Sequence, residues 1–145
     1  DTRVRKLLEG QVDYEVLAEA GLRRLGIDIG RVVLPLDYFP PEPGQGLIAV
    51  VAPGDTPLAA RLSKAGDPEA MTMARAERSF VSVLRAGCGS PVGGVSQVMG
   101  ERLVFIAGVA RQDGSSMTVV RLRGEASRPE ELGARAAEVI RGLMG

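Results

Sequence analysis

The segment from residue 34 to residue 46 constrains the fold of this 145-residue chain more than any other segment does. It carries four prolines and two glycines. Proline lacks the backbone N–H that helices and inner strands need, and glycine adds conformational freedom, so regular structure cannot run through it. We therefore expect a linker or binding loop here, with separately organised parts on either side.

Before this loop, apolar spacing predicts a short helix over residues 4–8, a strand over 12–18 and a helical turn over 19–25. After it, the apolar run at 47–51 has the character of a buried strand. Thr56 followed by proline predicts a helix that ends near residue 64. The alternation indicates an α/β part.

The remainder predicts a small α+β unit. Asp67 followed by proline starts a helix that we expect to end at Gly87. A capping-box pattern from Ser127 to Glu130 precedes a second helix with an apolar stripe at Leu132, Ala136, Val139, Ile140 and Leu143. Between the helices we expect a three-stranded antiparallel meander covered by helices, with strands at 92–99, 103–110 and 117–123.

Composition excludes several classes of function. Apolar residues make up 45% of the chain and charged residues 25%, as in ordinary soluble domains. Lysine plus arginine equals aspartate plus glutamate at 18 each, so we expect neither a nucleic-acid nor a membrane partner. The chain has no histidine and one cysteine, which argues against a zinc site, a Ser-His-Asp triad or an internal disulfide. A cytoplasmic location is expected, and an opening without methionine suggests a piece of a longer protein.

The single cysteine, Cys88, lies between Gly87 and Gly89 after the predicted helix. Neither neighbour has a side chain, so the sulfur has room to carry a bulky group. A lone cysteine is more often a small hydrophobic residue in a turn, and a helix C-terminus does nothing to lower a thiol pKa. Spacing alone leaves both readings open.

Three motifs resemble one family, the hydroxymethylbilane synthases (porphobilinogen deaminases). The run at 76–93, AERSFVSVLRAGCGSPVG, is similar to the family's A-E-R helix and the cysteine loop that follows it. The stretch at 1–26, which opens DTRVRKL and ends AGLRRLG, is similar to a second family motif. The PGQG sequence at 43–46 is similar to the third. The three motifs occur in the family's order.

The match departs from the family pattern at a few positions. Ala86 replaces a glycine, Arg85 stands where an acidic residue is common, and the Gly89–Ser90 pair follows the cysteine in place of glutamine and valine. Glu15 and Glu19 interrupt a stretch that is usually apolar, and nothing in the sequence accounts for them.

The resemblance implies a transferase. Such enzymes condense four porphobilinogen units into linear hydroxymethylbilane, releasing ammonia, on a dipyrromethane primer that a thioether attaches to the loop cysteine. Cys88 would be this anchor. The family's catalytic aspartate precedes the matched region, so no catalytic residue is expected in this chain, which alone would be inactive.

The resemblance also assigns four further cofactor-binding residues. Arg3 and Arg24 match arginines that bind the pyrrole carboxylates, although composition alone would make them ordinary surface residues. Gln45 and Gly46 match a loop that borders the cleft, although they could form only a turn. Arg5, Arg23 and Arg31 have no such support.

The family's plan divides the chain into three parts. Residues 1–40 would be the C-terminal part of a domain like those of periplasmic binding proteins. Residues 41–66 would return toward a first domain contributed by a missing N-terminal half. Residues 67–145 would form the α+β domain that anchors the cofactor, in a protein that acts as a monomer.

Two other classes of function remain open on the residues alone. The α/β part could belong to a non-catalytic ligand-binding module of periplasmic type, in which Cys88 has no role. The C-terminal α+β unit could also be a purely structural domain.

Overall fold

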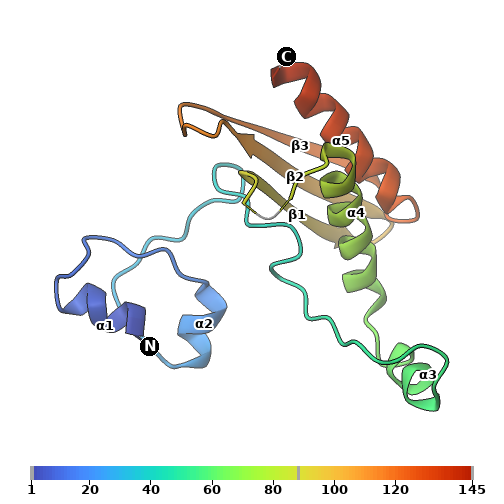
Figure 1. The fold of residues 1–145 in the computed structure, drawn as a ribbon, viewed down its shortest axis with the longest axis horizontal. Coiled ribbons are helices and arrows are strands. Elements are labelled where there is room, and N and C mark those ends of the chain that lie inside the picture. The colour runs from blue at the N-terminus through green and yellow to red at the C-terminus, as the bar shows by residue number, and fades with distance from the viewer. Residues whose placement is uncertain (1, 88, 145) are drawn as a thin grey trace. The chain divides into compact units, whose positions relative to one another are not determined.

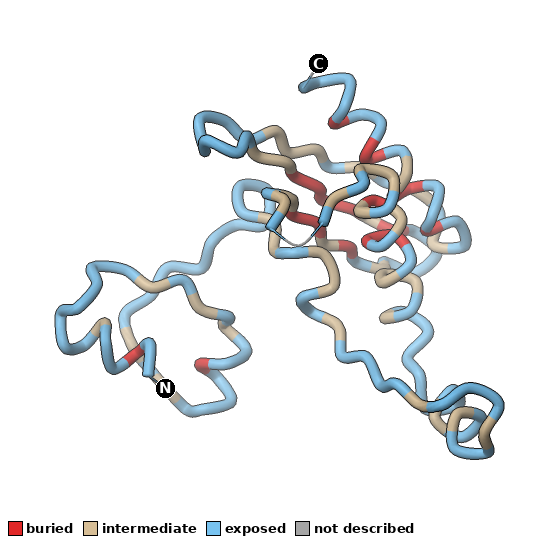
Figure 2. Tube along the Cα trace, in the orientation of Figure 1, coloured by how far each residue is buried: buried red, intermediate tan, exposed pale blue. Residues whose placement is uncertain are grey.

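The computed structural model describes residues 2–87 and 89–144, and it divides into two compact units at residues 33 and 34. Figure 1 traces the chain and labels its helices and strands. Figure 2 marks the buried residues, most of which belong to the sheet and the two long helices of the second unit. The architecture is mixed α/β, with one three-stranded antiparallel sheet in the described residues.

The first unit contains α1 (Thr2–Leu8) and α2 (Glu19–Arg24), as predicted. Its buried apolar residues are Val4 of α1 and Leu22 of α2. The strand predicted over residues 12–18 is wrong, because these residues form no strand. An apolar run becomes a strand only when another strand takes up its backbone hydrogen bonds, and no other strand is present in the described part of this unit.

The second unit is built around the predicted meander of β1 (Val92–Met99), β2 (Arg102–Ala110) and β3 (Met117–Glu125). The strands pair in the order β1-β2-β3, with Val95 opposite Ile106 and Ile106 opposite Arg121. The two turns contain Gly100 and Gly114, both at positive φ, which glycine adopts without strain.

Two helices cover one face of this sheet (Figure 1). α4 (Pro68–Leu84) contacts β1, while α5 (Pro129–Met144) contacts β3 and β2, and the two helices contact each other. The core between these layers centres on Phe80 of α4 and Phe105 of β2, whose rings meet edge to face at 5.4 Å. Leu103 and Ile140 are also fully buried there.

Capping residues set the ends of α4. The Asp67 carboxylate accepts hydrogen bonds from the N–H groups of Glu69 and Ala70, as expected for an N-cap before proline. The predicted end at Gly87 is wrong, because the helix stops at Leu84 and Arg85 adopts the left-handed conformation at φ 55°. A non-glycine residue therefore provides the C-cap here.

The start and the apolar stripe of α5 also differ from the prediction. The helix begins at Pro129, and the Ser127 hydroxyl contacts the Glu125 carboxylate instead of forming a capping box. Leu132, Ala136 and Ile140 are buried as predicted. Val139 and Leu143 are exposed, and the buried face instead includes Gly133 and Ala137.

Residues 37–40 lie on the other face of the sheet. Pro40 packs on the paired glycines Gly93 and Gly108, where an added Cβ would overlap its atoms. Arg121 of β3 forms an ion pair with Asp37 at 3.3 Å. The proline-rich segment therefore has no regular structure, as predicted, but it is packed against the sheet.

Residues between this segment and α4 are largely exposed. α3 (Pro57–Ser63) begins where Thr56 predicts, with the Thr56 hydroxyl accepting from the Ala59 N–H at 3.1 Å. The strand predicted over residues 47–51 is wrong, and Ile48, Val50 and Val51 are 86%, 71% and 91% exposed. None of the described helices is long and apolar enough to span a bilayer.

Candidate functional site

The loop at residues 42–47 is held by two consecutive turns. The Gln45 N–H donates to the Glu42 carbonyl and the Leu47 N–H donates to the Gly44 carbonyl, each at 3.0 Å. Gly44 has φ +83°, a conformation that favours glycine, so the PGQG sequence specifies this backbone path. Gln45 and Gly46 are exposed at its tip.

The Glu77 side chain joins this loop to the helix and the sheet. One carboxylate oxygen, Oε2, accepts from the Gly44 N–H at 2.7 Å. The other, Oε1, accepts from the Ser96 N–H at 2.9 Å and from the Ser96 hydroxyl at 2.8 Å. Among the described residues, Glu77 and Ser96 are the two buried polar or charged ones. Burial of a carboxylate is tolerated when donors satisfy it, as they do here.

The same contacts close the outer edge of β1. The Gly94 N–H donates to the Pro41 carbonyl at 2.7 Å. Two residues further along the strand, the Ser96 N–H donates to Glu77. A small pocket of about 80 Å³ lies where the loop meets α4 and β1, and Gln45, Gly46, Glu77 and Ser96 line it. Ligand pockets have volumes of roughly 300 Å³ or more, so this pocket is too small to be a binding cleft by itself. It shows where the loop contacts α4 and β1.

Sequence reasoning assigned no role to Glu77 or Ser96. A signal was present, because Glu77 follows Met73 by four residues on the helix face that carries Ala76 and Phe80. A carboxylate at an apolar position of a helix predicts a buried polar contact. Its partner at Ser96 could not be found without the register of β1.

A second loop follows α4. The Gly87 N–H donates to the Ser90 hydroxyl, and the Ser90 N–H donates to the Gly87 carbonyl, each at 3.0 Å. A Cβ added at Gly87 or Gly89 would meet no atom within 4 Å, so the surroundings of the loop are open. The predicted cofactor residue, Cys88, lies outside the described residues.

Arg141 of α5 stabilises the helix end from which this loop starts. Its guanidinium donates to the carbonyl oxygen of Val83, in the last turn of α4. Carbonyls in that turn lack intrahelical partners, and a cation favours the negative end of the helix dipole. Two residues therefore cap the C-terminus of α4: Arg141 through the Val83 carbonyl, and Arg85 through its left-handed backbone conformation. The loop starts directly after this capped end.

The predicted arginines Arg3 and Arg24 are exposed on α1 and α2, in the first unit, whereas Gln45 and Gly46 belong to the second unit.

The structure accounts for the acidic residue Glu19 in the first unit through its arginine contacts. This carboxylate accepts from Arg31 Nε at 2.9 Å, Arg31 Nη2 at 3.1 Å and Arg23 Nε at 2.8 Å. Hydrogen bonds from Arg31, and then from Arg23, lower the pKa of Glu19 to about 2. Nothing in the structure explains Glu15.

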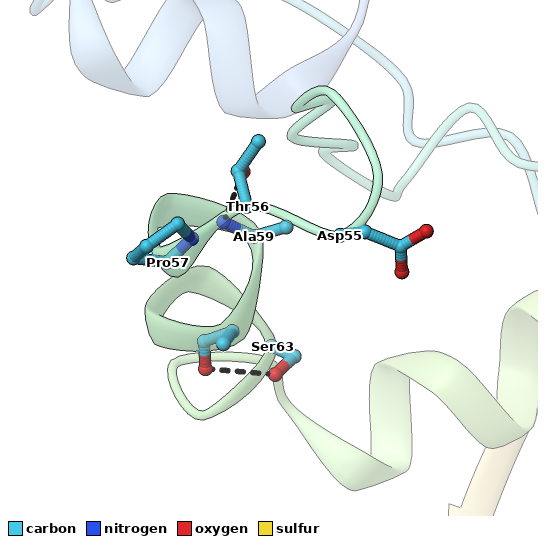
Figure 3. Close-up of a pocket in the computed structure, with 6 residues that line it drawn as sticks. Asp55, Thr56, Pro57, Ala59 and Ser63 are labelled. Atoms are coloured by element: carbon cyan, nitrogen blue, oxygen red, sulfur yellow. Dashed lines mark hydrogen bonds between the residues drawn. The ribbon is translucent and has the colours of Figure 1, made fainter.

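Another hollow lies at the start of α3 (Figure 3). Its polar groups satisfy each other or nearby backbone: the Thr56 hydroxyl donates to the Pro53 carbonyl and the Ser63 hydroxyl to the Ala60 carbonyl. The remaining polar side chain, Asp55, is exposed, and a single surface carboxylate does not define a binding site. Among the described residues, no three His, Cys, Asp or Glu side chains gather as metal ligands would.

Two family models match the chain in sequence order. Residues 1–61 match the model described as porphobilinogen deaminase, dipyrromethane cofactor binding domain, and residues 71–142 match the porphobilinogen deaminase C-terminal domain. The chain belongs to the porphobilinogen deaminase family. The resemblance seen in the three sequence motifs is thereby confirmed.

Relatives of similar sequence carry the family's name. A protein of Hyperthermus butylicus named "Probable porphobilinogen deaminase" is 44% identical over 99% of this chain. Proteins with the same name from Pyrobaculum arsenaticum and Methanothermobacter thermautotrophicus are 42% and 34% identical over 97% and 95% of the chain. Each match covers 48% of the relative, so this chain spans about half the length of these porphobilinogen deaminases.

Proposed function

We propose that this chain is the C-terminal half of a porphobilinogen deaminase that condenses four porphobilinogen units into linear hydroxymethylbilane, with release of ammonia. The observation that carries the proposal is the ordered match of both family models, one of them described as the dipyrromethane cofactor binding domain. The chain's span of about half of each relative supports its being one half of the enzyme.

In this proposal Cys88 anchors the dipyrromethane through a thioether. When bound, this group supplies the pyrrole end on which each new unit is added. An anchored chain makes every addition intramolecular, which removes most of the association entropy from each step. The open space around Gly87 and Gly89 fits a bulky group at this loop.

The residues that bind the cofactor are proposed on chemical grounds. Acetate and propionate groups on each pyrrole need cations, and the guanidinium groups of Arg3 and Arg24 can hold carboxylates through two parallel hydrogen bonds. The exposed amide of Gln45 and the bare backbone of Gly46 can approach the pyrroles closely. The catalytic aspartate is proposed to lie in the N-terminal half.

The exposed apolar residues at 47–51 support the proposal that another part of the same protein covers them. Ile48, Val50 and Val51 are largely exposed, although they belong to a run typical of a buried strand. We propose that the N-terminal half covers this exposed apolar surface. Residues 1–40 would then complete a domain of periplasmic-binding-protein type, residues 41–66 would return to the first domain, and residues 67–145 would anchor the cofactor.

Turnover tests this proposal. The 145-residue chain alone should make no hydroxymethylbilane from porphobilinogen. The full-length protein should make it, with one ammonia released per unit, as a cytoplasmic monomer. A full-length protein that releases no ammonia from porphobilinogen, or turnover by the 145-residue chain alone, would contradict the proposal.

A further inference from the structure

We propose that Glu77 is a positioning residue, which fixes the loop at residues 42–47 against α4 and β1 and so sets the pose of the growing pyrrole chain. The inference rests on the proposed function for its second part. The first part, the fixing of the loop, rests on the contacts of Glu77 alone.

The carboxylate is fully engaged by donors. Its Oε2 accepts from the Gly44 N–H, and its Oε1 accepts from the N–H and the hydroxyl of Ser96. Two backbone N–H groups thus donate to the carboxylate, one to each oxygen. The Ser96 hydroxyl has a single hydrogen, which can go to Glu77 Oε1 at 2.8 Å or to the Met73 carbonyl at 3.2 Å, and the shorter distance favours Glu77. The hydrogen bonds of the Glu77 side chain to described residues go to the loop and to the strand.

Each contact joins a different part of the fold. Gly44 is the positive-φ residue of the PGQG loop, at φ +83°. Ser96 lies on β1, an edge strand of the sheet, and Glu77 itself lies on α4, which precedes the loop that contains Cys88. Glu77 therefore sets the position of the 42–47 loop relative to the helix that precedes the proposed anchor.

The Gly44 N–H depends on this residue. Both turns of the loop use other groups: they join Gln45 to Glu42, and Leu47 to the Gly44 carbonyl. The Gly44 N–H donates to Glu77 Oε2, so loss of the carboxylate leaves this amide, at the centre of the loop, without that acceptor. Gln45 and Gly46, which follow it directly, line the same small pocket as Glu77 and would move with it.

Glu77→Gln separates the two contacts. The amide offers one acceptor oxygen, so either Ser96 or Gly44 must face its NH2 group. The Ser96 N–H is buried, whereas the Gly44 N–H is only partly buried and can reach water once the loop moves. The oxygen should therefore stay on Ser96 and the loop should be released. Glu138→Gln makes the same chemical change at an exposed position of α5 and is the matched control.

Amide hydrogen exchange in the full-length protein tests the fixing of the loop. In the wild type the Gly44 amide should be protected. In Glu77→Gln it should exchange at least about tenfold faster, while residues of β2 keep their protection and Glu138→Gln matches the wild type. An unprotected Gly44 amide in the wild type, which needs no variant to measure, would overturn the proposal. So would unchanged exchange in Glu77→Gln.

Turnover per molecule of loaded dipyrromethane tests the positioning role. A residue needed only for stability would lower the amount of folded protein and leave this ratio unchanged. We expect Glu77→Gln to lower it about tenfold and Glu138→Gln to leave it at the wild-type value. A loosened loop with an unchanged ratio would overturn the positioning role. A wild type without turnover would instead contradict the proposed function, and the exchange data would still decide whether Glu77 fixes the loop.

Discussion

Gly133 of α5 packs directly on the backbone of Ala76 in α4, so that a Cβ at position 133 would overlap the Ala76 carbonyl oxygen. The absence of a side chain at this one position allows the two helices to approach closely. Both residues belong to the buried layer that lies over the sheet, in which Ala76 is fully buried.

Gly133→Ala should therefore destabilise the protein, although alanine favours helix more than glycine does. Overpacking against backbone, which cannot rotate away, typically costs about 1–3 kcal/mol. Gly142→Ala, on the same helix, is the control: its added Cβ meets nothing within 4 Å, so the free energy of unfolding should rise by up to about 1 kcal/mol. Denaturant unfolding of both variants measures the difference, and equal signs would contradict the close packing.

Replacement of Arg85 should act in the opposite direction. Arg85 caps α4 at φ 55° and ψ 34°, a conformation that costs a residue with a Cβ roughly 1 kcal/mol. Arg85→Gly should raise the unfolding free energy by up to about that amount. Ser82→Gly, inside the same helix, should lower it by about 0.5 kcal/mol. If thermal unfolding shows that Arg85→Gly destabilises the protein, the left-handed cap is not the true helix end.

The ion pairs of Glu19 predict a pH dependence of the first unit. Its pKa is lowered to about 2 from an unfolded value of 4.5, so folding favours the ionised form. The resulting stabilisation is complete above about pH 4.5 and is lost as the pH falls toward 2. Glu19→Gln should remove this part of the acid dependence. An NMR titration of the Glu19 carboxyl with a midpoint near 4.5 would show that Arg31 and Arg23 do not hold it in solution.

Arg24 provides a test of the proposed carboxylate sites. In the full-length protein, Arg24→Leu should lower kcat/KM for porphobilinogen about ten- to a hundredfold, because a charge-assisted hydrogen bond contributes about 1.5–3 kcal/mol. Arg128→Leu should change it little, since Arg128 is exposed and its ion pairs with described residues, Glu125 and Glu131, are long at 3.8 and 3.7 Å. Equal effects of the two substitutions would remove the reason for assigning Arg24 to the cofactor.

The sequence predicts local features of the fold well. The starts of α3 and α4, the three strands and both hairpins follow from caps, prolines, glycines and apolar alternation, all of which act within a few residues. Residues 47–51 show where this reasoning fails. Their apolar pattern is typical of a strand, but a strand also needs a pairing partner, which a local pattern does not specify.

The candidate site likewise contains features that the sequence predicts and contacts that it does not. The motifs point to the PGQG loop and to the loop that contains Cys88, because both depend on glycine positions that can be read in order. The contact between Glu77 and Ser96 joins α4 to β1 across 19 residues, and the Arg31 contact with Glu19 joins residues 12 apart. Contacts of this kind depend on tertiary packing, so only the structure reveals them.

The mass of the intact full-length protein tests the central claim most directly. If Cys88 anchors the cofactor, the wild type should be heavier than its polypeptide by one dipyrromethane, and its cysteine should resist alkylation. Cys88→Ser changes a single atom, so it should fold normally, have the bare polypeptide mass and lose most of its turnover. A bare polypeptide mass with a freely alkylated Cys88 in fully active wild-type enzyme would contradict the account.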